Sequence, residues 1–176
     1  MVVASLLCGA CGVATTDVST TAKTYTGSYS AQVVESTVST SLTGGGTFPC
    51  TNTYTMSGTL TMTLDQVGGA MIGSAQIIGT QTETAHSSGP SCLAKGDLST
   101  GWSPKLTGTT ADIRFEDQNI ATNGGYSVTS KTSFAGTLSG GIVTGVLGFS
   151  VAGSGTIGGI TSIVQNYTST MSVTLR

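Results

Sequence analysis

Few residues in this chain could perform acid–base or nucleophilic chemistry. The only histidine, His86, lies with Glu83 in the polar segment 82–90, which ends in Gly89-Pro90 and is therefore expected to be a loop. A histidine serves as a general base only when a nucleophile lies within its reach. No recognisable nucleophile motif accompanies His86, so we expect a solvated loop residue and no catalytic residues. A hydrolase that uses His86 with the acidic strand described next is the alternative from the enzyme class.

The densest charge cluster comprises Asp112, Arg114, Glu116 and Asp117. A period of two places the first three on one face of an expected strand at 108–116. Carboxylates grouped in this way could act as a catalytic pair or hold a calcium ion. An arginine between two carboxylates is more simply a surface ion network, which contributes little energy. We therefore expect no metal site and no cofactor.

The N-terminal run 1–12 is apolar, free of turn signals and rich in small residues at its end, which is typical of the tail of a secretory signal peptide. Within it, Leu7-Cys8-Gly9-Ala10-Cys11 resembles the lipobox of bacterial lipoproteins. The resemblance implies that residues 1–10 are a signal-peptide remnant and that Cys11 carries a lipid. It also implies an exported protein, anchored at the bacterial outer membrane or cell surface, with residues 11–22 as a tether.

Two alternatives to lipidation remain for this segment. It could be a plain signal segment. Cys8 and Cys11 could also form a redox or metal pair, but such a pair normally lies at a helix start beside a strand or is matched by a second pair. If both cysteines belong to the signal and the anchor, Cys50 and Cys92 are the two that remain, and export provides the oxidising setting for a disulfide between them.

The region between Cys50 and Cys92 carries the clearest strand pattern. Residues 53–64 alternate strictly between threonine or serine and larger or small apolar residues, which indicates a strand with one buried face. A turn at 65–69 and a second strand complete a hairpin in which Leu64 is expected to face Met71. Further along the chain, Gly140-Gly141 predicts a two-residue turn that sets Leu138 opposite Val143.

The same alternation recurs along the chain and predicts an all-β domain over residues 23–176. About eight consecutive antiparallel strands favour a single up-and-down β-barrel, which leaves no exposed sheet edge. A two-sheet β-sandwich is the alternative. Glycines recur at inward positions, as strands that bend around a small barrel require. The outline resembles lipocalin- and avidin-type barrels in architecture. The outward faces are threonine and serine, which differs from the apolar band of a membrane-spanning barrel.

Such a barrel interior could be open or filled. Inward glycine and alanine beside large side chains could leave a cavity for a small apolar ligand, or the large side chains could pack against one another. Trp102, in the irregular segment 97–106 with Pro104, could mark a mouth, a partner surface or a buried plug. The possible cavity lining is Tyr25, Tyr29, Tyr54, Met56, Trp102, Phe134 and Phe149.

Composition limits the partners. Only 8% of residues are charged, the net charge is −2, and the six lysines and arginines are scattered, which excludes a nucleic-acid surface. The sequence thus predicts a non-catalytic binding or structural module of the bacterial cell envelope. It would contact the membrane through its lipid and bind an envelope protein or a small apolar ligand. A secreted carrier of a small apolar ligand is the alternative function.

Overall fold

The computed structural model describes residues 21–41, 46–87, 98–157 and 160–176. Every regular element in these ranges is a β-strand, so the described chain contains no helix able to cross a membrane. The strands are β1 (Lys23–Ser41), β2 (Thr47–Val67), β3 (Ala70–His86), β4 (Leu98–Trp102), β5 (Lys105–Thr109), β6 (Asp112–Asn123), β7 (Gly125–Ser139), β8 (Ile142–Ile157) and β9 (Ile160–Leu175). Most run far longer than the typical five or six residues.

The strands form one antiparallel sheet that closes into a ring, which confirms the predicted up-and-down barrel-like fold. Going round the ring, the order is β2, β1, β9, β8, β7, β6, β5 and β3, and β3 pairs again with β2. Strands β4 and β5 share one position, because both pair with β3: Trp102 lies opposite Ile77 and Leu106 opposite Gly73. The break between them falls at Pro104, which has no backbone N–H to donate to a ladder.

The first and last strands close the ring. Residues 36–41 of β1 pair with residues 160–166 of β9 near one end. At the other end the backbone N–H of Thr26 donates to the carbonyl of Arg176 at 2.9 Å, and the N–H of Arg176 donates back at 3.1 Å. Gly27 permits this approach, because a Cβ there would collide with the Thr174 carbonyl. The ring therefore closes through backbone hydrogen bonds at both ends.

Two glycine pairs set the strand registers. Gly140-Gly141 forms the predicted turn with φ values of 58° and 78°, and Leu138 lies opposite Val143 as expected. The register predicted for the β2–β3 hairpin was wrong by two residues. Gly68-Gly69, with φ values of 56° and 87°, is itself the two-residue turn, so Leu64 faces Gly73 instead of Met71. A shift of two preserves which side chains face inward, and the predicted buried face was therefore right.

Several strands extend beyond their predicted ends. β1 continues to Ser41, and β2 begins at Thr47, before the alternating run 53–64 that the sequence indicated. β3 continues to His86, which lies opposite Asn52, so the predicted loop at 82–90 was wrong as far as residue 86. In each case polar residues join a ladder because a neighbouring strand continues beside them and satisfies their backbone groups.

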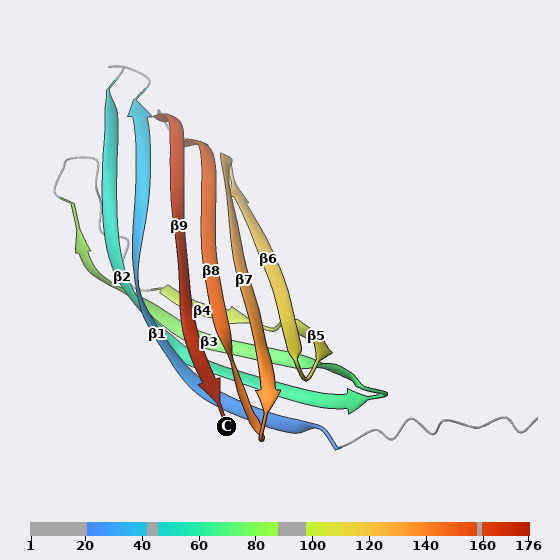
Figure 1. The fold of residues 1–176 in the computed structure, drawn as a ribbon. Coiled ribbons are helices and arrows are strands. Elements are labelled where there is room, and N and C mark those ends of the chain that lie inside the picture. The colour runs from blue at the N-terminus through green and yellow to red at the C-terminus, as the bar shows by residue number, and fades with distance from the viewer. Residues whose placement is uncertain (1–20, 42–45, 88–97, 158–159) are drawn as a thin grey trace, which may run out of the picture.

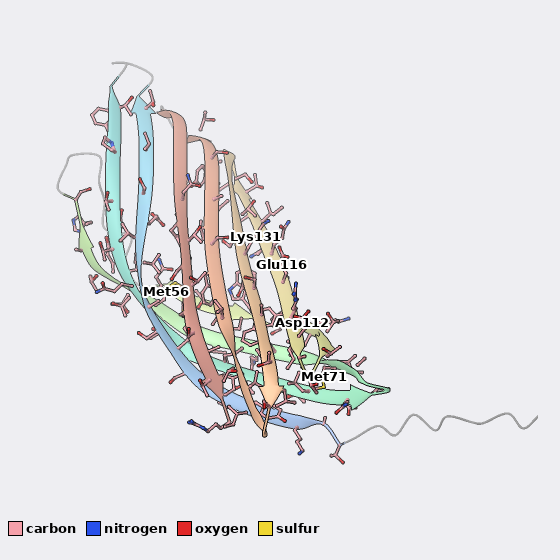
Figure 2. All side chains as sticks on the ribbon, in the orientation of Figure 1. Met56, Met71, Asp112, Glu116 and Lys131 are labelled. Atoms are coloured by element: carbon pink, nitrogen blue, oxygen red, sulfur yellow. The ribbon has the colours of Figure 1, made fainter. Side chains whose placement is uncertain are left out.

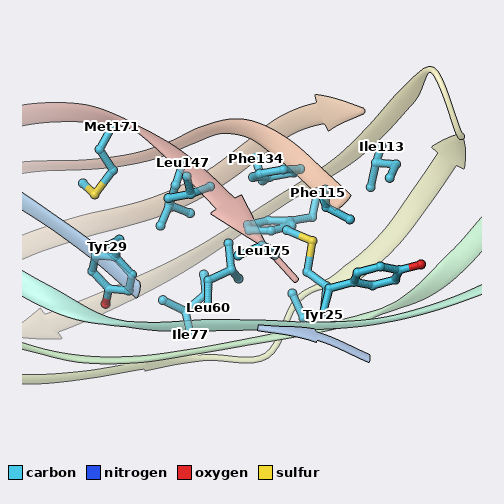
Figure 3. Close-up of a cluster of buried hydrophobic side chains, with 14 of the residues drawn as sticks. Tyr25, Tyr29, Leu60, Ile77, Ile113, Phe115, Phe134, Leu147, Met171 and Leu175 are labelled. Atoms are coloured by element: carbon cyan, nitrogen blue, oxygen red, sulfur yellow. The ribbon is translucent and has the colours of Figure 1, made fainter. Parts of the chain in front are cut away.

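The ring is flattened rather than round. Figure 1 shows β1 and β2 curving strongly, so that their lower halves, with β3, cross beneath the upright strands β6 to β9. We call the end with the β2–β3, β5–β6 and β7–β8 turns the lower end, and the end with the β6–β7 turn the upper end. Apolar side chains from both groups of strands meet between them, as Figure 3 shows for Leu60, Ile77, Leu147 and Leu175.

Candidate functional site

The residues predicted to line a cavity do come together inside the ring. Six of them are buried in one hydrophobic cluster: Tyr25, Tyr29, Tyr54, Met56, Phe134 and Phe149. Trp102 is half-buried and packs against the same cluster. The rings of Tyr29 and Phe149 lie 5.7 Å apart between centroids, and Phe134 stacks on Phe115 at the same distance. These side chains contact one another across the interior, which favours the packed alternative over an open lining.

Inward glycines provide the space that the aromatic rings occupy. Gly58 lies opposite Gly79, and a Cβ on either would collide with the Tyr29 hydroxyl. Gly136 lies opposite Gly145, and a Cβ on either would collide with the Phe134 ring. Glycines at these positions were expected to let the strands bend. The structure gives them a second role, as recesses into which a neighbouring ring fits.

The upper part of the interior is polar, which the sequence did not predict. Glu35 on β1 is buried, and its Oε2 accepts a hydrogen bond from Gln165 Nε2 at 2.6 Å. Its Oε1 accepts a bond from the Thr37 hydroxyl at 3.3 Å, and the Tyr126 hydroxyl donates to Gln165 Oε1 at 2.5 Å. These hydrogen bonds link β1, β9 and β7 through side chains alone. The sequence feature that could have indicated this polar interior is the position of Glu35 two residues after Val33, which places both side chains on the inward face of β1.

A second polar chain joins β2 to the end of β3. Asn52 is buried and its Nδ2 donates to Glu83 Oε1 at 2.7 Å. His86 Nδ1 lies 3.6 Å from the same oxygen, beyond hydrogen-bonding distance, and its side chain is 43% exposed. His86 thus lies beside a carboxylate at the rim of the ring, and among the described residues no serine, threonine or cysteine is bonded to it as a nucleophile. Its contact with Glu83 was not predicted.

Tyrosines beside these carboxylates are held in their neutral form. Burial, and then the charge of Glu35, raises the pKa of Tyr167 to about 12. Burial raises the pKa of Tyr54 further, with smaller contributions from Glu35 and Glu83. The Tyr54 hydroxyl is buried with no hydrogen-bond partner in the part of the chain that the structure describes. Desolvation dominates both shifts, so these groups are structural hydroxyls at neutral pH.

The largest described hollow lies on the outside of the ring. It has a volume of about 550 Å³ and crosses strands β5 to β9, with Ser133, Ala135 and Gly148 along it and Lys105 and Thr170 at its sides. A smaller hollow of about 140 Å³ adjoins it and shares Glu116, Ser133, Gly148 and Thr170. We call the two together the outer groove. Phe134 and Phe149, predicted to line an inner cavity, also contribute to its floor.

Charged side chains border the outer groove. Arg114 bonds to Asp112 at 2.5 Å, with both side chains largely exposed, so the predicted ion pair is present but does not include Glu116. Lys105 and Lys131 line the groove and form no ion pair with any described residue. Figure 2 shows Asp112, Glu116 and Lys131 following one another along β6 and β7. Two amines without an ion-pair partner among the described residues thus border a groove whose lining also includes the Glu116 carboxylate, the Arg114 guanidinium and several hydroxyl groups.

Trp102 lines a separate hollow of about 260 Å³ between β4 and β6. Its other lining residues are Gly101 and Ser103 on β4's side and Asp117, Gln118 and Asn119 on β6. β4 and β6 do not pair with each other here. β6 pairs with β5 through residues 112–114, and β4 pairs only with β3. Trp102 therefore combines two of its predicted roles: one part packs on the core and another lies at an opening in the wall.

The remaining predicted sites are only partly covered by the structure. Cys50 is buried at the upper end of β2, but Cys92 and the lipid-attachment residue Cys11 lie outside the described residues. The disulfide and the lipid anchor therefore remain predictions. Among the described residues, no three histidine, cysteine, aspartate or glutamate side chains are placed to hold a metal ion.

Comparison with known proteins adds no family. The sequence matches no protein-family model and no curated protein.

Proposed function

We propose that the protein is a non-catalytic β-barrel binding module of the bacterial cell envelope, tethered by a lipid on Cys11. The observation that carries the binding role is the contrast between an interior filled by its own side chains and a groove of about 550 Å³ on the outer face. A groove on the outer face can bind a partner that is too large to enter the ring. The lipobox-like Leu7–Cys11 segment supports the envelope location.

The proposal that the protein has no catalytic role is supported by the position of His86. Catalysis by a histidine needs a nucleophile on one side and an orienting group on the other. Glu83 could orient the ring, but His86 lies at the exposed rim and at 3.6 Å from that carboxylate. Asp112 and Arg114, the other half of the hydrolase alternative, pair with each other on the outer face of β6. These contacts support a binding role rather than a hydrolytic one.

The groove suits a protein segment that carries acidic side chains. Lys105 and Lys131 approach it from β5 and β7 without a carboxylate partner among the described residues. Exposed amines of this kind contribute to binding specificity through charge complementarity and add little to the affinity. Gly148 keeps the floor low, since a side chain there would rise beside Ser133 and Thr170. An envelope protein with an acidic loop is the partner that we propose.

The carrier alternative receives less support. A carrier holds its ligand in an interior cavity, yet Leu60, Met62, Leu147 and Leu175 fill the space between the two groups of strands. The described hollows open on the outer face, at the β4–β6 opening and beside Tyr25 at the lower end. Ligand uptake through these would first require the core to separate.

The anchor is tested by metabolic labelling with a fatty-acid analogue. Cells producing the full chain should incorporate the label, and the variant Cys11→Ala should lose it. Cys8→Ala is the matched control, because it removes the neighbouring cysteine and leaves the proposed lipid attachment intact. Equal labelling of Cys11→Ala and the unaltered chain would refute the anchor.

The groove is tested by placing a photo-crosslinking amino acid at Ser133, on its floor, or at Thr59, an exposed position on β2 on another part of the wall. We expect a discrete adduct in the native host from position 133 and none from 59. The double variant Lys105→Glu with Lys131→Glu should abolish it, whereas Lys23→Glu, a charge reversal outside the groove, should not. Adducts at both positions would rule out the groove as the binding face, and an adduct at position 133 that survives the double reversal would rule out an acidic partner.

A further inference from the structure

Among the described strands, the upper part of β6 lacks a partner along one edge, and β4 across the gap is paired only with β3. β6 pairs with β7 along its whole length, from Ile113 to Asn123. On its other side it pairs with β5 only through residues 112–114. Within the described ranges no strand lies along the remaining edge, and the hollow that contains Trp102 separates its beginning from β4. Nine residues of β6, 115–123, therefore present one free side.

This edge lacks most of the features that keep natural edges from pairing. Residues 118–123 read Gln-Asn-Ile-Ala-Thr-Asn, with no lysine, no proline and no charge, and all six are exposed. Ile120 is 56% exposed. The β6–β7 ladder has no bulge that would turn the edge away. Long, uncharged edges of this kind are templates for another strand.

One protective contact shows which backbone groups face outward. The backbone N–H of Gln118 donates to Asp117 Oδ1 at 2.9 Å, so it is not used by β7. In an antiparallel ladder the groups of successive residues point to alternate sides. The N–H and C=O groups of Ile120 and Thr122 therefore face the free side with that of Gln118. Glu116 precedes Gln118 on this side. Asp117 covers the Gln118 donor and leaves those of Ile120 and Thr122 open.

We propose that two copies of this chain associate by antiparallel pairing of their β6 edges about a two-fold axis at Ile120. In this register Ile120 faces its own symmetry mate, and Gln118 faces Thr122 of the second copy. Glu116 would face Gly124 and Asp117 would face Asn123, so no like charges oppose each other. An isologous contact needs a surface that complements itself, and this segment does so through its backbone and its one large apolar side chain. The inference is independent of the outer groove.

The association should be weak and concentration-dependent. A contact confined to one strand edge and its flanking side chains falls below the roughly 1,200 Å² of a stable interface. Sedimentation equilibrium of the full chain, carrying Cys8→Ser and Cys11→Ser to exclude disulfide-linked oligomers, should show a reversible monomer–dimer equilibrium. A chain that stays monomeric at every concentration would overturn the proposal, as would assemblies larger than a dimer.

Ile120 and Ile78 make a matched pair of test sites. Both are 56% exposed, but Ile78 lies on β3 between two partners, Thr59 and Gly101. Ile120→Lys sets two like charges opposite each other across the axis and should weaken dimerisation at least tenfold. Ile78→Lys should leave the dissociation constant unchanged. If Ile120→Lys fails to fold, Thr122→Lys places a charge at the next outward-facing position and should also weaken the dimer. Equal effects at positions 78 and 120 would overturn the proposed register.

A covalent readout distinguishes this edge from other contacts. In the same background, Ile120→Cys should form an intermolecular disulfide with itself on mild oxidation, because residues directly opposite in a ladder lie within disulfide reach. Peptide mapping should identify the 120–120 linkage, and Ile78→Cys should give none. A dimer that shows no 120–120 linkage would contradict pairing through β6.

Discussion

The two ends of the barrel interior are built differently on the same sheet. At the lower end, Leu64, Met71, Ile113 and Leu175 belong to the hydrophobic cluster, in which the Phe134 ring lies over Gly136 and Gly145. At the upper end, Glu35, Asn52 and Gln165 turn inward from the same alternating pattern. Gln165 donates to Glu35 and accepts from Tyr126, and Asn52 donates to Glu83. The lower end is stabilised by the burial and packing of apolar side chains, and the upper end by hydrogen bonds between polar side chains.

The difference shows what alternation does and does not determine. Alternation decides that a side chain points inward, but the neighbours from other strands decide whether the site is apolar or polar. A buried carboxylate is tolerated only where donors converge on it, as Gln165 and Thr37 converge on Glu35. The effects of mutations at the two ends should therefore differ in size and in chemical origin, and four measurements test this difference.

The largest effect is expected at the lower end, from Phe134→Ala. The Phe134 ring is buried between Phe115 and the Gly136–Gly145 recess, and removing it should leave a cavity that costs about 3–5 kcal/mol. Urea unfolding followed by circular dichroism would measure the loss. Phe48→Ala near the upper end, where the ring is 38% exposed, should cost far less. Comparable losses at both positions would contradict the contrast.

The upper end has less apolar packing, so a covalent link there should matter more. If Cys50 and Cys92 are bonded as predicted, replacing both by alanine should lower the free energy of unfolding by about 3–4 kcal/mol. Hydrogen exchange should show lost protection near Asn52 and little change near Leu64. Mass spectrometry that finds both thiols free in the purified, unaltered protein would refute the bridge.

A smaller effect is expected from Glu35→Leu, which removes the acceptor for Gln165 and Thr37 and leaves their partly buried donors without it. The cost should be about 1–3 kcal/mol. Glu35→Gln should cost less, since its amide oxygen still accepts one of these bonds. Glu116→Gln on the exposed outer face is the matched control and should change stability by no more than about 0.5 kcal/mol. If Glu35→Leu proves neutral, the polar chain does not stabilise the upper end.

The smallest effect concerns alkaline pH. The pKa of Tyr167 is raised to about 12 from 10.0, by burial and then by Glu35. Because the folded pKa lies above the unfolded one, the stabilisation is fully present below pH 10.0 and is lost as pH rises from there to about 12. Tyr126 and Tyr54 shift in the same direction, so Tyr167→Phe should reduce the loss only partly. An unchanged pH profile of the urea midpoint in Tyr167→Phe would show that Tyr167 does not contribute.

Local sequence signals predicted much of the fold. The Gly140-Gly141 turn fixed the β7–β8 register, and the alternation at 53–64 identified the buried face of β2. The β2–β3 register was missed because Gly68-Gly69 was included in a longer loop. The outer groove had no sequence signal, since Lys105 and Lys131 lie on different strands and meet only through the pairing of β5, β6 and β7.

By itself, the sequence determined the all-β class, the inward residues and the glycine turns, because each depends on neighbours within a few positions along the chain. The tertiary structure alone decided how the ring closes, which glycines hold aromatic rings, and where Glu35 finds Gln165, 130 residues away. It also decided that β6 has no second partner beyond residue 114 among the described strands, because β4 and β5 divide one strand position at Pro104 and only β5 reaches β6. Contacts between distant segments depend on strand bending and register, and these are set by the packing of the whole ring.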